Sequence, residues 1–405
     1  MVHTYELSIP ILVAAVWLAE FEVSTAVMGV VVTIGYGLFG VGALPGGVLT
    51  DRFGSRRLIA ACLFGMGGSF VLLGFATSIW LLALALLVWG AAASVYHPAG
   101  LSLISTGVED RGRVFAYHGM AGNVGIALGP LTTAILLLFL DWRVVVLLLA
   151  VPAGIAALYA LRADVDERAA VTATDGGSVD DASDDSDATD GDSEADPGVS
   201  SFSEFFAESR VLLASTFVVV FGIVMLSGLY YRGVLTFLPE ILREFAVFAP
   251  VEVGERTLEP ADYFYAGLLM VGILGQYVGG RLTDRMRPER GLALGFAALA
   301  IVGIVFLPAA NAGIGPFLVI GALLGFFLFL VQPLYQATVA EHTPPSARGL
   351  SYGYTYLGVF GVGSLGGALA GAILTYQSEA TLFLVLAVFA VVAAILGFAL
   401  TRYDW

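Results

Sequence analysis

The sequence predicts an all-α membrane protein in which twelve transmembrane helices form two pseudo-symmetric six-helix bundles. Of its 405 residues 58% are apolar and only 13% are charged, and the mean hydropathy is +0.90. Apolar runs of about 20 residues, long enough to cross a bilayer core, recur along nearly the whole chain. These runs lack the two-residue alternation of a barrel strand, so they predict helices.

The predicted spans follow one another from the first residues to the last. No basic segment precedes the first run and further spans follow it directly, so we expect a transmembrane helix there and not a secretory signal. This first span is short, which leaves open a start of translation upstream of Met1. The twelve spans are predicted at 2–19, 25–49, 58–77, 79–104, 114–140, 143–161, 211–239, 261–282, 291–309, 315–339, 350–375 and 380–401.

An acidic segment divides the chain into an N-terminal bundle (1–161), a linker (162–210) and a C-terminal bundle (211–405). The net charge is −15, and residues 162–208 alone hold 15 Asp and Glu against 2 Arg. The rest of the chain is therefore nearly neutral. Residues 174–198 contain no aromatic residue and a single large aliphatic one, so we expect them to be disordered, either as a solvated tether or as a regulatory tail.

The distribution of arginine predicts the orientation in the membrane. Short cytoplasmic loops carry the excess of positive charge. With the N-terminus inside, fourteen of the 18 Arg fall on the cytoplasmic side and three, Arg143, Arg243 and Arg256, on the other. We therefore expect a multi-pass plasma-membrane protein whose termini and linker are cytoplasmic. The complete absence of Lys beside an acidic linker is typical of halophilic prokaryotes, and we expect a halophilic archaeon.

The chain also repeats a loop sequence at long range. Residues 46–52 read GGVLTDR at the end of the second span, and residues 279–285 read GGRLTDR at the end of the eighth, 233 positions later. Pro98 and Pro333 recur at nearly the same offset. Equivalent loops fall on the same side of the membrane, so the repeats are parallel. In transporters such repeats enclose a substrate site between the two halves.

The loop after the second span closely resembles the loop signature of the major facilitator superfamily. With its second copy and the twelve spans, the resemblance covers nearly the whole chain and implies that family's fold and its alternating-access mechanism. We expect the glycines to allow close helix packing and the charged residues to form a state-dependent cluster at a cytoplasmic gate, although Arg56 and Arg57 could serve topology alone. The motif residues are Gly47, Asp51, Arg52, Gly54, Arg56, Arg57, Gly280, Asp284 and Arg285.

In the fifth span, Gly125, Gly129 and Pro130 resemble the first part of the antiporter signature of the family's drug exporters. A Thr-Ala pair replaces the glycine pair that ends this signature. Proline bends a helix and glycine allows close packing, so a kinked gate and simple helix packing are both open interpretations. Leu86 stands where these exporters carry a buried arginine, which argues against their standard proton-antiport mechanism.

Of the ionisable residues within the predicted spans, four matter most: Glu6, His97, His118 and Arg232. The strings around the histidines and Arg232 are similar to the fosmidomycin-resistance branch of the superfamily. An ionisable group in a membrane is costly unless it faces a cavity or a partner, so all four are candidates for coupling or substrate binding. Histidine, whose ordinary pKa lies near neutrality, suits proton coupling, and helix capping is the alternative. Glu6 could carry a proton or face the cytoplasm, and Arg232 could attract an anion or extend to the outer interface.

Three glutamines add uncharged hydrogen-bonding groups at the expected depth of a cavity. They are Gln276 in the eighth span and Gln332 and Gln336 in the tenth, where a spacing of four places both on one helix face. Hydrogen bonding between helices is the alternative role.

The sequence offers nothing for catalysis. It has no phosphate-binding loop and no metal-ligand spacing, and its lone Cys62 lies in an apolar run. We therefore expect neither an enzyme nor a cofactor or metal, no ATP-driven pump and, from the acidic charge, no nucleic-acid binding.

We expect a monomeric secondary active transporter whose partners are protons, a small molecule and the lipid bilayer, and which exports a small organic compound or drug. Proton- or ion-coupled uptake of an organic anion is the alternative, supported by Arg232. A membrane sensor that does not transport is a third possibility, with the linker as its signalling element.

Overall fold

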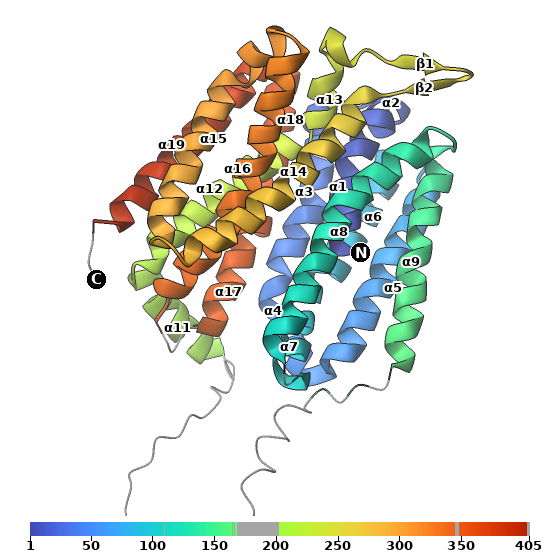
Figure 1. The fold of residues 1–405 in the computed structure, drawn as a ribbon. Coiled ribbons are helices and arrows are strands. Elements are labelled where there is room, and N and C mark those ends of the chain that lie inside the picture. The colour runs from blue at the N-terminus through green and yellow to red at the C-terminus, as the bar shows by residue number, and fades with distance from the viewer. Residues whose placement is uncertain (109, 164, 166, 168–201, 345–347, 403–405) are drawn as a thin grey trace, which may run out of the picture.

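The computed structural model describes residues 1–405 apart from 109, 164, 166, 168–201, 345–347 and 403–405. Most of the described residues are helical, and the helices form two bundles that lie side by side (Figure 1). Buried apolar side chains of both bundles belong to one continuous core. The predicted fold class is confirmed.

The N-terminal half is helical throughout. It contains α1 (Val2–Leu12), the π-helical turn η1 (Val13–Trp17), α2 (Leu18–Glu20), α3 (Thr25–Val41), α4 (Ala43–Phe53), α5 (Ser55–Gly74), α6 (Ile79–Ser94), α7 (Tyr96–Gly107), α8 (Arg111–Leu137) and α9 (Trp142–Arg162).

The C-terminal half adds a small hairpin to its helices. It contains α11 (Phe202–Ala214), α12 (Phe217–Leu235), α13 (Leu238–Arg243), the 3-10 turn η3 (Ala246–Phe248), β1 (Val251–Val253), β2 (Arg256–Leu258), α14 (Pro260–Thr283), α15 (Pro288–Asn311), α16 (Ile314–Glu341), α17 (Arg348–Tyr356), the π-helical turn η5 (Leu357–Val362), α18 (Leu365–Tyr376) and α19 (Glu379–Leu400).

Ten helices of the described chain are long and apolar enough to cross a membrane, and α3 with α4 make an eleventh as a pair bent by 41°. The predicted span 25–49 is thus broken, at Gly42, which packs against the side chain of Ser94. The predicted span that remains, 261–282, corresponds to α14, which has 24 residues and whose hydropathy is lowered by Gln276 and several glycines. With α14 the two bundles contain the twelve predicted helices.

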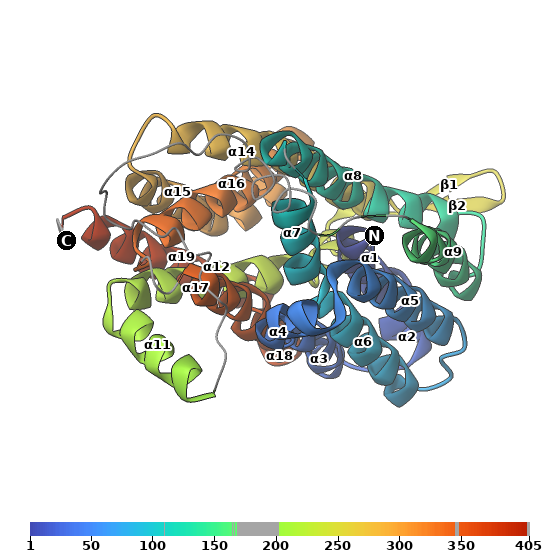
Figure 2. The same cartoon turned by 90° about the horizontal axis from the view of Figure 1, so that it is seen from below.

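The two ends of the molecule differ, and we call them the hairpin end and the linker end. The hairpin end carries β1 and β2, an antiparallel pair with Val251 opposite Leu258. The linker end is where the chain leaves α9 and returns at α11 (Figure 1). Figure 2 shows the molecule from the linker end, with the N-terminal half (α1 to α9) and the C-terminal half (α11 to α19) side by side.

The repeated loop sequence corresponds to a repeated helix contact. A Cβ on Gly46 in α4 would lie 2.8 Å from Cγ of Pro98 in α7. A Cβ on Gly279 in α14 would lie 2.7 Å from Cγ of Pro333 in α16. Real side chains do not approach so closely, so glycine is required at both places for the helices to pack. The two halves therefore share this contact as well as the sequence.

Hydrogen bonds between the halves gather from the middle of the molecule to the hairpin end. Thr25 Oγ1, at the start of α3, donates to the carbonyl of Gly371 in α18 at 3.0 Å and lies 2.8 Å from Thr375 Oγ1. At the same end, Arg256 in β2 places its Cζ 4.1 Å from the ring centroid of Phe139, just after α8. Further hydrogen bonds between the halves join α3 to α18 and to Ser364 just before it, and α1 to α12.

The structure describes only the two ends of the predicted linker, 162–210. Helix α11 begins at Phe202, inside the predicted linker, because the sequence from this point spaces apolar residues three and four apart. The Glu167 carboxylate accepts hydrogen bonds from the backbone nitrogens of Ser55 at 2.8 Å and Arg56 at 3.1 Å, at the start of α5. The disorder predicted for 174–198 falls outside the described residues.

Candidate functional site

A cavity of about 270 Å³ lies between the two halves, and both halves line it. The N-terminal half contributes α1, α7 and α8, and the C-terminal half contributes α12, α14, α16, α17 and η5. This is the place that the parallel repeat predicts for a substrate site. Six aromatic residues form much of its wall: Tyr231, Phe329, Tyr335, Tyr352, Tyr356 and Phe360.

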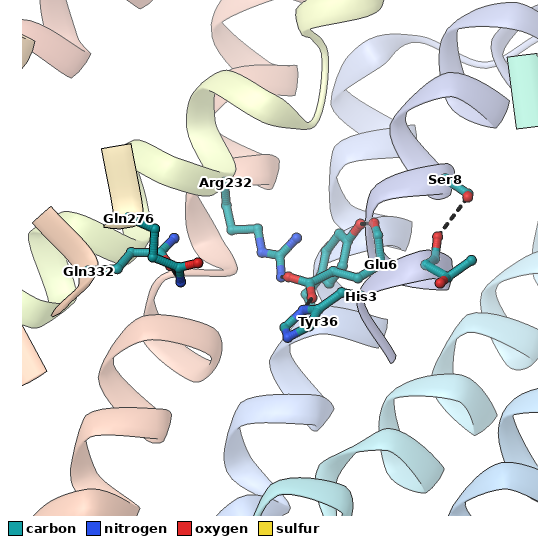
Figure 3. A network of polar contacts seen from close by, with 8 residues as sticks. His3, Glu6, Ser8, Tyr36, Arg232, Gln276 and Gln332 are labelled. Carbon is teal, nitrogen blue, oxygen red and sulfur yellow. Dashed lines mark hydrogen bonds and ion pairs between the residues drawn. The ribbon is translucent and has the colours of Figure 1, made fainter. Parts of the chain in front are cut away.

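Glu6 and Arg232 form a buried ion pair across the two halves (Figure 3). Nη2 of Arg232 on α12 donates to Oε1 of Glu6 on α1, and each residue is 1% exposed. Burying two charges costs several kcal/mol per ion, roughly, and only close pairing with further hydrogen bonds offsets this. Glu6 therefore does not face solvent and Arg232 does not extend to the outer interface, so both of these alternatives are wrong.

Tyr36 on α3 contacts both members of the pair. Its hydroxyl donates to the backbone carbonyl of Glu6 at 2.6 Å, and its ring centroid lies 3.5 Å from Cζ of Arg232. The rings of Tyr231 and Phe360 lie further away, at 5.4 and 5.8 Å. Aromatic faces attract a guanidinium, most strongly when water is excluded. Nε of Arg232, by contrast, is buried with no hydrogen-bond partner among the described residues.

The second oxygen of Glu6 contacts His3, one helical turn earlier on α1. His3 Nδ1 lies 2.9 Å from Glu6 Oε2. An ionised carboxylate can only accept, so this bond requires the proton on Nδ1. His3 and Glu6 both line the first cavity, where the His3 side chain is 27% exposed and that of Glu6 2%. Of the two, His3 is therefore the one more open to the cavity.

His97 and His118 line a second cavity of about 330 Å³, which also includes His3. Along α8 it is lined from Ile126 in the middle of the helix as far as His118, on the side of the linker end. The His97 ring stacks on Tyr356 with centroids 5.1 Å apart, and its Nε2 is buried with no partner among the described residues. The His118 ring stacks on Tyr96 at 5.8 Å. Neither histidine caps a helix, because α7 has no side-chain cap and Asp110 caps α8.

The three predicted glutamines all line the first cavity. Gln276 Nε2 on α14 donates to Gln332 Oε1 on α16 across a long 3.4 Å (Figure 3). The two predicted roles therefore coexist here, since these amides join two helices and also face the space between the halves. Within the described residues, no group of three or more His, Cys, Asp or Glu could hold a metal ion.

The family follows from comparison with known proteins. The family model described as Major Facilitator Superfamily matches residues 2–358 and, in a second match, 263–404. The chain belongs to the major facilitator superfamily. Among solved structures, this superfamily chain resembles the nucleoside transporter NupG, with 13% identity, a TM-score of 0.74, and 98% of this chain and 96% of that one covered. It also resembles a bacterial homologue of the human lysosomal transporter Spinster, in an inward-facing and occupied conformation, with 15% identity, a TM-score of 0.72, and coverage of 99% and 94%.

Curated relatives match shorter stretches of this superfamily protein. It is 37% identical over 108 residues to a puromycin resistance protein of Streptomyces alboniger, which covers 26% of this chain and 22% of the relative. It is 32% identical over 142 residues to a Na⁺, Li⁺, K⁺/H⁺ antiporter of Planococcus maritimus, covering 33% and 32%. It is 33% identical over 130 residues to a lincomycin resistance protein of Streptomyces lincolnensis, covering 31% and 26%. The chain thus matches about a quarter to a third of the length of these relatives.

The first copy of the superfamily's loop motif lies at the linker end. Arg52 and Arg57 are exposed, while Arg56 Nη1 donates to the carbonyl of Ala163 at 2.5 Å. Gly54 ends α4 with a φ of 82°, a conformation that favours glycine. The side chain of Asp51 falls outside the described residues, so the charge cluster expected around it stays a prediction.

The second glycine in each copy of the motif does not pack against a neighbouring helix. A Cβ at Gly47 or at Gly280 would meet open space, so the close helix packing expected at these two positions is wrong. The preceding glycine of each copy makes the close contact instead, because it is the one that faces the neighbouring helix. Asp284 and Arg285 are exposed, and neither forms an ion pair within the described part of the chain.

The glycines of the fifth predicted span pack α8 against α1. A Cβ at Gly125 would lie 3.1 Å from Thr4 Oγ1, and a Cβ at Gly129 would lie 2.7 Å from the backbone of Thr4. Helix α8 continues through Pro130 to Leu137. At these two glycines the contacts agree with close packing of α8 against α1. A gating role for Pro130 stays a prediction.

His3 and Tyr36 were not among the predicted site residues. The signal for His3 was present, because His3 and Glu6 lie three residues apart and so share one face of a membrane helix. Tyr36 has no such signal, since it reaches Arg232 only when the two halves come together. The hairpin of β1 and β2 was missed as well, because its three-residue strands are too short to show a pattern.

Proposed function

We propose that this chain is a proton-coupled secondary transporter of the plasma membrane, which exports a small organic compound by alternating access. The observation that carries the proposal is the buried pair of Glu6 and Arg232, which joins the halves beside a cavity that both halves line. Ionisable groups inside a membrane are expensive and mark ion or substrate pathways. Neutralising Glu6 with a proton removes its ionic attraction to Arg232, and this weakens one of the contacts that hold the halves together.

The orientation in the membrane indicates which conformation of the transport cycle this structure represents. We place the linker end in the cytoplasm, together with both termini, because most loop arginines lie there. The hydrogen bonds between the halves then close the outer side, and the second cavity extends towards the cytoplasm. This combination corresponds to an inward-facing conformation, in which a cytoplasmic compound enters the site.

The chemistry of the cavity suits a compound with rings and neutral hydrogen-bonding groups. Aromatic side chains supply flat apolar faces, while Gln276, Gln332 and Gln336 supply amide donors and acceptors. The partial matches to puromycin and lincomycin resistance proteins support export of such a compound.

Coupled uptake of an organic anion is the alternative. A proton on Glu6 would release Arg232, which could then hold an anion. Arg232 is not in the wall of either cavity described above, however, and Glu6 occupies its Nη2. This observation favours export. A sensor that does not transport is not favoured.

Transport by the purified protein in liposomes tests the proposal. We expect puromycin or lincomycin to accumulate in vesicles with an acidic interior, and benzoate, as the organic anion, not to follow a gradient of either sign. Glu6→Gln should abolish the gradient-driven accumulation. Glu252→Gln, on the exposed hairpin, is the matched control and should leave it intact. Accumulation by Glu6→Gln at the rate of the unmodified protein would refute the role of Glu6, and benzoate uptake would favour the alternative.

The linker is proposed as a tether without a role in transport. Deletion of residues 170–198 should then leave accumulation in the same liposomes unchanged. A loss of accumulation with normal protein levels in the membrane would show that the linker regulates the transporter.

A further inference from the structure

We propose that His3 relays the coupling proton, taking it up from the cavity at Nε2 and passing a proton from Nδ1 to Oε2 of Glu6. The inference deepens the proposed function, because it names the residue through which protons reach the buried ion pair. Its basis is that one histidine contacts the Glu6 carboxylate and also lines both cavities, whereas Glu6 lines only the first. Nδ1 lies 2.9 Å from Glu6 Oε2, and the same ring lines both cavities.

The ring edge that carries Cδ2 and Nε2 lies beside Gly122, in the wall of the second cavity. A Cβ at Gly122 would lie 3.5 Å from Cδ2 and 3.9 Å from Nε2. Because glycine has no side chain, nothing from this position covers the nitrogen. Within the described residues Nε2 makes no hydrogen bond. A cavity of about 330 Å³ has room for several water molecules, each of which would occupy about 30 Å³ as in the liquid.

Direct protonation of Glu6 is less accessible than this route. Oε1 is occupied by Arg232, so a proton there would break the ion pair's hydrogen bond. Oε2 receives the Nδ1–H of His3, so a proton arriving there directly would face another donor. Glu6 also lines the first cavity, but its side chain is only 2% exposed, whereas that of His3 is 27% exposed. Uptake at Nε2 breaks no existing hydrogen bond.

The relay balances in protons and charge. A proton from cavity water binds Nε2 and gives an imidazolium, whose Nδ1 proton then moves to Oε2 of Glu6. His3 ends neutral with its proton on Nε2, and the Glu6 carboxylic acid donates back to Nδ1. One positive charge has been added, and Arg232 has lost its anion. In the inward-facing state the reverse sequence delivers the proton to the cytoplasmic cavity and restores the ion pair.

Other titratable groups lie around His3 and interact with it electrostatically. They are the amino group of Met1, Glu6 on α1, Tyr36 on α3, Tyr96 and His97 on α7, His118 on α8, Tyr231 and Arg232 on α12, Tyr335 on α16, and Tyr352 and Tyr356 on α17, while α14 presents the neutral Gln276. With the histidines neutral, Glu6 and Arg232 cancel, which leaves the amino group of Met1 as the remaining basic group beside the second cavity. Of the three histidines, only His3 bonds to Glu6.

Time-resolved infrared spectroscopy after a pH jump tests the relay without any substrate. The carboxylic-acid band that is missing in Glu6→Gln is assigned to Glu6. In His3→Gln, which keeps an N–H donor for Glu6 but cannot carry a proton, this band should rise about a hundredfold more slowly. His342→Gln is the matched control, since His342 also pairs with a glutamate, Glu289, outside both cavities. Its band should rise at the rate of the unmodified protein.

Chemical rescue separates a relay from a structural role. In His3→Ala, added imidazole should restore the rate of the Glu6 band, because a free imidazole can occupy the space of the lost ring and carry the proton. An unchanged rate in His3→Gln, or no rescue of a folded His3→Ala, would overturn the relay. Failure of the proposed transport function would instead show in the liposome assay, where no gradient of either sign would drive accumulation.

Discussion

The ion pair between the halves makes a quantitative prediction about stability. Glu6 and Arg232 have side chains that are each 2% exposed, so a substitution that removes one charge leaves the other buried without a counter-ion. Loss of one partner of such a pair costs about 3–5 kcal/mol. We expect this cost for Glu6→Gln. Arg232→Gln should cost somewhat more, because it also removes the guanidinium from the ring of Tyr36, at 3.5 Å, a contact worth about 2 kcal/mol when desolvated.

The double variant, with both Glu6→Gln and Arg232→Gln, measures the interaction energy of the two charges apart from the other effects of each substitution. With both charges removed, the two glutamines leave no buried ion, so the loss should be about 2 kcal/mol or more below the sum of the single losses. The free energy of unfolding of the purified protein, measured by denaturant titration in micelles, gives all four corners of this cycle. If the loss in the double variant equals the sum of the two single losses within about 0.5 kcal/mol, the two charges do not interact and the prediction is refuted.

Three further predictions concern the packing and the linker end. Gly129→Ala places a methyl group 2.7 Å from the backbone of Thr4 and should lower the free energy of unfolding by about 1–3 kcal/mol, whereas Gly119→Ala, with open space around it, should be neutral. Glu167→Ala removes the acceptor of two backbone N–H groups at the start of α5 and should cost about 1 kcal/mol in the same measurement; no change would contradict the contact. Asp51→Asn should reduce transport in liposomes while membrane insertion stays normal, and full activity would exclude a gating role for this residue.

The sequence by itself determined the helices, the repeat and the family. Continuous apolar runs leave no other structure that satisfies the backbone in lipid, so the approximate positions of the membrane helices follow from where these runs lie. The repeated GGxLTDR loops fixed the relation of the halves, and the structure places their first glycines, Gly46 and Gly279, in equivalent contacts. These features are local in sequence or depend on counting along the chain, which is why they could be predicted.

Only the tertiary structure decided which polar residues act together. Glu6 and Arg232 each looked like an isolated charge with two possible environments, and the choice between solvent and a partner depends on how α1 packs against α12. The same packing brings Tyr36 onto the guanidinium and places His3 against the Glu6 carboxylate in the wall of the cavity. A buried charge is tolerated only where a second charge meets it, and a meeting between residues 226 positions apart is set by the fold and not by any pattern in the sequence.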